Sequence, residues 1–192
     1  MNRTATLLLM AAVARLALAA ETVADRAVAG LRDPEAGDAA WQSILAVGKS
    51  AVPELTKLTA DRNERVRVRA AVLLYRLGGA EALDVLAALV DSKDEGTRNE
   101  AADALRAFVG APLPVQSSPL QADALARWKV WWQANRQAAI GTPPMSRLHA
   151  TVLAADAKSG AVALSLTARH GAARGMVLTV RRGAEAVGSV EI

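Results

Sequence analysis

The sequence of 192 residues contains no cysteine and only two histidines, His149 and His170. The missing thiols exclude disulfides, thiolate nucleophiles and cysteine-ligated zinc. The two histidines are too far apart in sequence for an H-x-x-x-H zinc pair. The chain also lacks the G-x-S-x-G, G-x-G-x-x-G and G-x-x-x-x-G-K-[ST] patterns of hydrolases and nucleotide-binding loops. We therefore predict no catalytic, cofactor-binding or metal-binding residues and a protein that is not an enzyme.

Aromatic residues are scarce, at 3% of the chain, and four of the six are tryptophans. Trp128, Trp131 and Trp132 fall on one face of a predicted helix together with Leu125. Such a face can form a ligand cage or a base-stacking platform. Packing is the commoner role, so we expect these tryptophans to seal the end of a helical stack and Trp41 to be a core residue.

The excess of basic residues is confined to the two ends of the chain. Formal net charge is +4, yet residues 21–144 carry 15 Lys and Arg against 16 Asp and Glu. Residues 145–192 carry six basic against three acidic residues, and Arg3 and Arg15 lie at the N-terminus. A nearly neutral helical part gives little support for a polyanionic partner such as nucleic acid.

Residues 1–20 have the layout of a secretory signal peptide. Arg3 precedes the apolar run Ala5–Ala14, and Ala17 and Ala19 form an A-x-A site before Glu21. The alternative is an Ala/Leu-rich helix that begins the helical domain. A transmembrane anchor fits less well because the run is shorter than the roughly 20 residues that a span needs.

An internal repeat organises the middle of the chain. The pattern Leu55–Leu74 recurs further along at Leu86–Leu105, including the Leu-x-x-Leu and Ala-Ala positions. A short repeat with two amphipathic helices is typical of an α-solenoid, in which each unit buries its apolar face against the next.

The predicted fold is therefore mainly α, a short α-α solenoid of about three helix pairs plus a closing helix over residues 21–140. The expected helices are Thr22–Leu31, Glu35–Val47, Ser50–Ala60, Arg62 or Asn63 to Leu77, Glu81–Val90, Glu95–Val109 and Ser117–Arg136.

A helical wheel of residues 63–77 separates two faces. The predicted core face consists of Val66, Ala70, Leu73, Leu74 and Leu77. The opposite face is the candidate partner-binding stripe, which consists of Arg65, Arg69, Val72 and Arg76. An ordinary solvated face is the alternative. The positions equivalent to the three arginines in the next repeat are Gly96, Glu100 and Ala107, so the stripe is not repeated.

The periodicity changes after a linker at residues 141–147. Along residues 148–192, apolar and other residues alternate as they do in strands, and turn residues separate the alternating runs. The expected strands are Ala150–Ala155, Ala161–Leu166, Met176–Val180 and Val187–Ile192. We predict a small antiparallel β-sheet or partial barrel with a hairpin between the last two strands. An exposed sheet edge would be free to add a partner strand.

Three resemblances follow from these motifs. The segment Val68–Gly78, with Arg69, Ala70, Ala71 and Leu74, resembles HEAT repeats. The segment Arg127–Asn135, with its W-x-x-W-W pattern, is similar to the closing helix of exported bacterial HEAT-repeat proteins. The segment Gly171–Val190 resembles the envelope β domains of the rod-shape-determining protein MreC and of flagellar assembly protein T. These likenesses imply an architecture and a cell-envelope role but no reaction.

The hypothesis that follows is a periplasmic or secreted scaffold that binds a protein partner, without cofactors and without a membrane span in the mature chain. The oligomeric state is left open. A cytoplasmic location is the alternative, and with it two other functions. One is nucleic-acid binding in the manner of HEAT-like DNA glycosylases, which needs a continuous basic face. The other is a HEAT-like lyase such as a bilin lyase.

Overall fold

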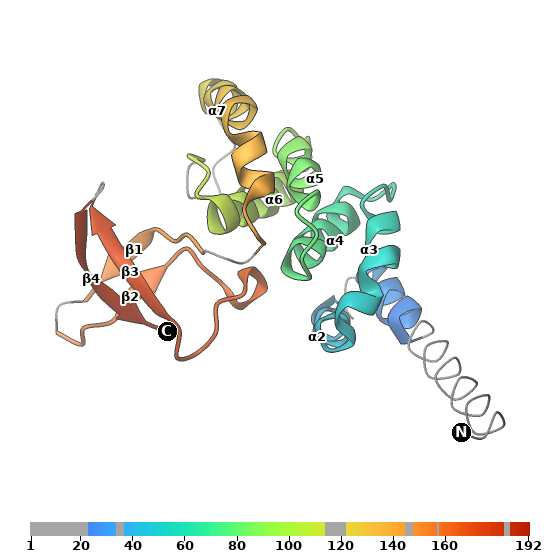
Figure 1. Ribbon diagram of the computed structural model, residues 1–192, viewed down its shortest axis with the longest axis horizontal. Coiled ribbons are helices and arrows are strands. Elements are labelled where there is room, and N and C mark those ends of the chain that lie inside the picture. The colour runs from blue at the N-terminus through green and yellow to red at the C-terminus, as the bar shows by residue number, and fades with distance from the viewer. Residues whose placement is uncertain (1–22, 34–36, 114–121, 145–147, 157, 183–184) are drawn as a thin grey trace, which may run out of the picture.

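The computed structural model describes residues 23–33, 37–113, 122–144, 148–156, 158–182 and 185–192. Helices stack side by side through the first two-thirds of this part of the chain, and strands follow (Figure 1). Residues 23–29 are helical and lead into the 3-10 turn η1 (Gly30–Arg32). The helices that follow are α2 (Gly37–Val47), α3 (Val52–Leu58), α4 (Glu64–Arg76), α5 (Ala82–Leu89), α6 (Glu95–Val109) and α7 (Ala122–Gly141), with the 3-10 turn η2 (Gly48–Ala51) before α3.

The predicted order of helices is confirmed, and their ends are set by local chemistry. The Asn63 side chain accepts a hydrogen bond from the Arg65 backbone N–H and so caps the start of α4. Asp94 caps α6 in the same way, through the Thr97 N–H. Gly110, at φ 65°, ends α6 in the left-handed conformation that glycine adopts without strain. Each signal is visible in the sequence.

The predicted end of the closing helix at Arg136 is wrong. The helix α7 continues through Gly141, into the expected linker. Ala138 and Ala139 are strong helix formers, and Thr142 extends the last turn by donating from its Oγ1 to the Ala138 carbonyl at 2.8 Å. Pro143 and Pro144, which cannot continue a helix, then follow. The predicted helix start at Ser117 lies outside the described residues.

One hydrophobic core runs through the helical stack. Leu55 and Leu86 are fully buried, and so are Leu74 and Leu105, which hold equivalent positions in successive units. The repeated apolar positions therefore form the interface between units, as the internal repeat of the sequence predicts.

Helix α4 is buried on both sides, which the helical wheel did not predict. The expected core residues Val66, Ala70, Leu73 and Leu74 are buried, and Leu77 is partly buried. Val72, placed by the wheel on the exposed stripe, is only 2% exposed. The prediction of Val72 as a surface residue is wrong because α2, α6 and a C-terminal segment pack against that side of α4.

The C-terminal part forms two separate sheets instead of one. Strands β1 (Val152–Ala155) and β2 (Val162–Leu164) pair antiparallel, and β3 (Val177–Arg182) pairs antiparallel with β4 (Glu185–Glu191). The predicted hairpin is confirmed by the second pair. The predicted antiparallel β structure is confirmed, but its strands divide between two two-stranded sheets, and no closed barrel forms among the described strands. After β2 the chain leaves the sheet and forms the 3-10 turn η3 (Ala168–His170), which packs against α4 and α6.

The predicted packing role of the tryptophans is confirmed. Trp128 is 1% exposed and stacks on Trp131 and Trp132, whose ring centroids lie 5.5 and 5.4 Å away. Both neighbours pack against the main core. Ion pairs also join α7 to Asp84 of α5 and to Asp91 in the turn after it. Helix α7 therefore covers the apolar end of the stack.

We predict that Trp128→Ala lowers the free energy of unfolding by about 3–5 kcal/mol, because it removes a buried aromatic and leaves a cavity. Val130→Ala, on the exposed side of the same helix, is the control and should change it by less than about 0.5 kcal/mol. Urea unfolding followed by circular dichroism measures both. Equal changes in the free energy of unfolding for the two substitutions would show that α7 does not seal the core.

Candidate partner-binding face

The turns inside successive repeats share the same polar contacts. Arg67 donates to the Asp61 carbonyl at 2.8 Å, and Arg98, its equivalent in the next repeat, donates to the Ser92 carbonyl at 2.8 Å. The side chains of Asp61 and Ser92 in turn accept from the backbone N–H two residues on. These local bonds give each turn the shape that starts its second helix. The repeat is thus carried by turn chemistry as well as by apolar residues.

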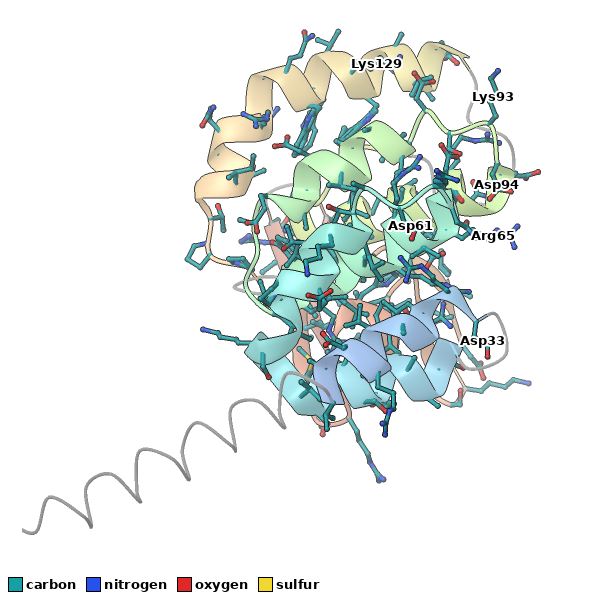
Figure 2. The ribbon with its side chains drawn as sticks, turned by 90° about the vertical axis from the view of Figure 1, so that its right-hand side faces the viewer. Asp33, Asp61, Arg65, Lys93, Asp94 and Lys129 are labelled. Carbon is teal, nitrogen blue, oxygen red and sulfur yellow. The ribbon has the colours of Figure 1, made fainter. Side chains whose placement is uncertain are left out.

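Arginine–aspartate pairs join one repeat to the next along this edge of the stack, where Asp61, Arg65 and Asp94 lie (Figure 2). Arg32 donates to Asp61 at 2.9 and 2.8 Å. Arg65 donates to Asp94 at 3.3 and 3.4 Å. Arg65, a member of the candidate stripe, is therefore engaged in a contact between repeats.

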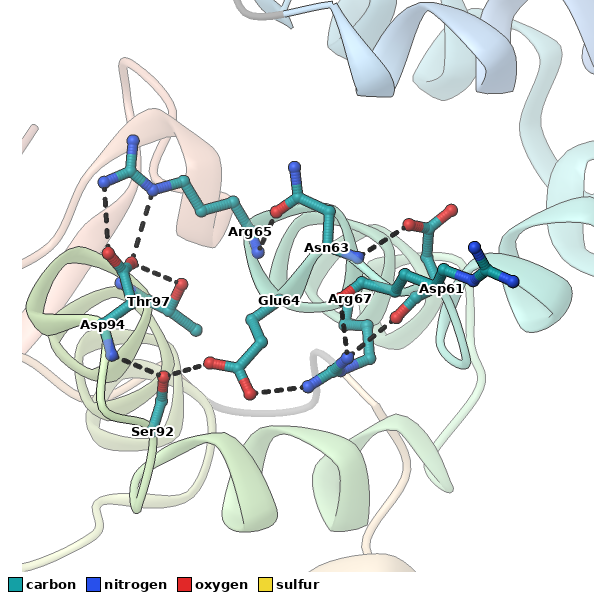
Figure 3. A network of polar contacts seen from close by, with 9 residues as sticks. Asp61, Asn63, Glu64, Arg65, Arg67, Ser92, Asp94 and Thr97 are labelled. Carbon is teal, nitrogen blue, oxygen red and sulfur yellow. Dashed lines mark hydrogen bonds and ion pairs between the residues drawn. The ribbon is translucent and has the colours of Figure 1, made fainter.

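Glu64 extends the same contact into a network (Figure 3). It accepts from Arg67 of its own helix at 2.7 Å and from the hydroxyl of Ser92 in the next turn. The Ser92 hydroxyl also accepts from the Asp94 N–H at 3.1 Å. Side chains at the start of α4 thereby contact both Ser92 and Asp94 of the next turn, which joins the starts of α4 and α6.

These bonds lower the pKa of the aspartates. The pKa of Asp94 falls to about 2, first because Thr97 donates to it from its side chain and backbone, and then because Arg65 pairs with it. The pKa of Asp61 is also lowered, by the Asn63 backbone N–H and by Arg32. Both carboxylates are accordingly held in the charged form.

Helix α4, which carries the rest of the candidate stripe, packs against α2 and α6. Arg69 lies near Glu100 of α6, whose pKa is raised by burial, against the opposing effect of the positive charges of Arg69, Arg169 and Arg65. The position equivalent to Arg69 in the next repeat is Glu100 itself. The break in the stripe therefore places an acid beside the arginines.

Arg76 contacts the C-terminal segment directly. Its Nη1 donates to the carbonyl oxygens of Ala168 and Arg169, at 3.1 and 3.3 Å. Burial lowers the pKa of Arg76 from its usual value. The residue thus binds a stretch of backbone from a part of the chain 92 and 93 residues away.

Arg169 projects from that segment onto the helices. Its guanidinium lies 5.6 Å from the centroid of the Trp41 ring, 2.6 Å from an Asp38 oxygen and 3.8 Å from a Glu100 oxygen. The neighbouring His170 is buried and meets Phe108 edge to face, at 6.1 Å between ring centroids. We call the residues that contact the segment the tail-contact face: Asp38, Trp41, Arg76, Glu100 and Phe108.

The structure brings the sequence-predicted residues together only in part. Arg76 belongs to the tail-contact face and Arg69 lies near its Glu100, whereas Arg65 pairs with Asp94 and Val72 is buried. Sequence reasoning missed the tail-contact residues Asp38 and Glu100 and their ligand Arg169. The signal for Glu100 was the reversal of charge at a repeated position; no repeat or motif marks Arg169.

The helical part matches a known repeat family. Residues 13–106 match the family model of HEAT repeats. No curated protein and no solved structure gives a significant match to the chain. The match covers the solenoid from α2 into α6, and HEAT repeats generally mediate protein interactions.

Within the described ranges, no helix is both long and apolar enough to cross a membrane. In the same ranges, no group of three or more His, Asp or Glu residues is placed to hold a metal ion.

We predict that acid destabilises the protein less when Asp94 is replaced by Asn. The pKa of Asp94 is lower in the folded chain than its usual 3.8. The contribution of the Asp94 carboxylate to the free energy of unfolding is therefore complete above about pH 4 and is lost as pH falls toward about 2. Asn keeps the helix cap but has no charge to lose. The urea midpoint, measured between about pH 5 and 2, should fall less steeply for Asp94→Asn, and the same slope for both proteins would contradict this account.

Proposed function

We propose that the protein is a non-enzymatic scaffold of the bacterial cell envelope, and that its HEAT repeats bind an extended segment of a protein partner on the tail-contact face. One observation carries the proposal: this face already holds a segment of the same chain, through Arg76 and the carbonyls of Ala168 and Arg169. A surface that binds backbone in this way suits a peptide ligand, since every residue of a peptide offers a carbonyl acceptor.

The charge distribution favours a protein over a nucleic acid. A phosphate backbone is bound by several unpaired cations on one surface. Here Arg65 pairs with Asp94, and Glu100 and Asp38 lie among the remaining arginines. The mixture of charges supports recognition of a polypeptide that carries both carbonyl acceptors and basic side chains.

The envelope location is supported by the signal-peptide layout of residues 1–20 and by the likeness of Arg127–Asn135 to exported HEAT-repeat proteins. The match to HEAT repeats begins at residue 13, so it overlaps the end of the signal-peptide layout. The overlap makes the N-terminus of the mature protein the decisive measurement. We expect N-terminal sequencing of protein from a fractionated bacterial host to give Ala20 or Glu21 in the periplasmic fraction. Retention of Met1 in the cytoplasmic fraction would refute the envelope location.

We predict that Arg65→Glu, Arg69→Glu and Arg76→Glu together reduce capture of partners from an envelope fraction by at least about tenfold. The change reverses the charge beside the tail-contact face and removes the donor to the bound backbone. The matched control replaces three exposed cations in turns, Lys49, Arg62 and Lys93, by Glu.

Circular dichroism must show that the triple Glu variant stays helical. If that variant unfolds, the same three arginines are replaced by Gln instead. Partner capture that is unchanged in folded Glu or Gln variants would remove these arginines from the account.

A further inference from the structure

The side chain of Arg169 is held by three groups that together suit a guanidinium. Asp38 and Glu100 supply negative charge at 2.6 and 3.8 Å, and the Trp41 ring lies under the cation at 5.6 Å. A planar guanidinium can stack on an aromatic ring and pair with carboxylates at its edge at the same time. Trp41 is 4% exposed, so its position is fixed by the core. We call Asp38, Trp41 and Glu100 the arginine slot.

The three slot residues come from different parts of the solenoid. Asp38 and Trp41 lie on α2 and Glu100 lies on α6, and both helices pack against α4. Stacking of the repeats is therefore what assembles the slot. A slot built across repeats reads one side chain of a ligand that lies across the helices, while Arg76 of α4 binds the adjacent carbonyls.

The ion pair between Arg169 and Asp38, one of the two that hold Arg169 in the slot, is exposed to solvent. The Arg169 side chain is 45% exposed and the Asp38 side chain 87% exposed. Exposed ion pairs contribute little to stability and are screened by salt. A hollow of about 320 Å³ remains beside the segment, with Gly96, Asn99 and Asp103 in its wall. The face thus has room for a ligand with larger side chains than those of Thr167–His170.

The occupant has a fixed local shape that a competing peptide can copy. The Thr167 N–H donates to Nδ1 of His170 at 3.3 Å, and the His170 N–H donates to the Thr167 carbonyl at 3.0 Å. This turn presents the Arg169 side chain and the two carbonyls to the helices together. The hydrogen bonds of this turn join residues within Thr167–His170, so a short peptide contains all the groups that form them.

We propose that the arginine slot is the specificity site of the scaffold, and that it binds an arginine of a partner protein in place of Arg169. Thr167–His170 is then an internal competitor that covers the face until such a partner arrives. This inference rests on the proposed function and adds to it the chemistry of the ligand, a segment with an arginine beside accessible carbonyls.

The test uses the full chain and a fluorescent peptide with the sequence of Leu164–Ala172. Arg169→Ala in the protein empties the slot, and fluorescence anisotropy measures peptide binding. We expect the emptied protein to bind the peptide at least about tenfold more tightly than the unaltered protein does. Arg174→Ala, which removes an exposed arginine further along the same tail, is the matched control and should behave like the unaltered protein.

Two further changes test the slot itself. A peptide in which the residue corresponding to Arg169 is Gln should lose most of its affinity for the emptied protein. Asp38→Asn together with Glu100→Gln in the emptied protein should have the same effect on the original peptide. Equal binding of the Arg and Gln peptides, equal binding to emptied and unaltered proteins, or no binding at all would each overturn the inference.

Light scattering distinguishes whether the slot takes an arginine from a partner protein or from a second copy of this chain. A dimer of the unaltered protein that Arg169→Ala dissolves would show that the tail fills the slot of another copy, which would also overturn the inference. The proposed function is tested separately, by partner capture with the Arg65, Arg69 and Arg76 variants. If partners are captured equally well by the unaltered protein and by the slot variants, the scaffold function is supported and only the inference about the arginine slot is overturned.

Discussion

Each two-helix unit of this solenoid has an apolar face that only a neighbouring structure can cover, and most of the molecule follows from this constraint. Leu74 and Leu105 are buried because the units stack. Trp128 is buried because the last unit needs a cover. The same stacking brings Asp38, Trp41 and Glu100 from separate helices to one face, where Arg169 contacts them. The candidate site is thus a product of the repeat architecture, and its residues belong to positions at which the repeats differ from one another.

Much of the helical fold is predictable because its determinants are local or periodic. The repeated apolar pattern locates the helices, and Asn63, Asp94 and Gly110 mark their ends by capping chemistry. The tryptophan face of the closing helix is predictable because a solenoid must be sealed. The match of residues 13–106 to HEAT repeats agrees with this interpretation.

The site is less predictable because it depends on contacts between segments that are distant in sequence. Val72 looks exposed on a helical wheel, which assumes one buried side, but α4 is covered on two sides. The strands were located correctly, yet their division into two sheets follows from the chain's detour through η3 to the helices. No periodic pattern marks Arg169, and its role can be recognised only from its contacts with Asp38, Trp41 and Glu100. The one available signal was the acid at position 100, where the repeat would place an arginine.

The central claim is that the HEAT repeats hold the chain's own Thr167–His170 segment on the tail-contact face. The chain has a single phenylalanine, so the ring protons of Phe108 can be observed without ambiguity by selective labelling. Nuclear Overhauser effects between the Phe108 and His170 rings in the unaltered protein measure the claim directly, since the two rings meet edge to face. We predict strong cross-peaks between them, in addition to those from Tyr75, which stacks on Phe108. Cross-peaks to Tyr75 alone would contradict the account, because they would show an intact helical core without the docked segment.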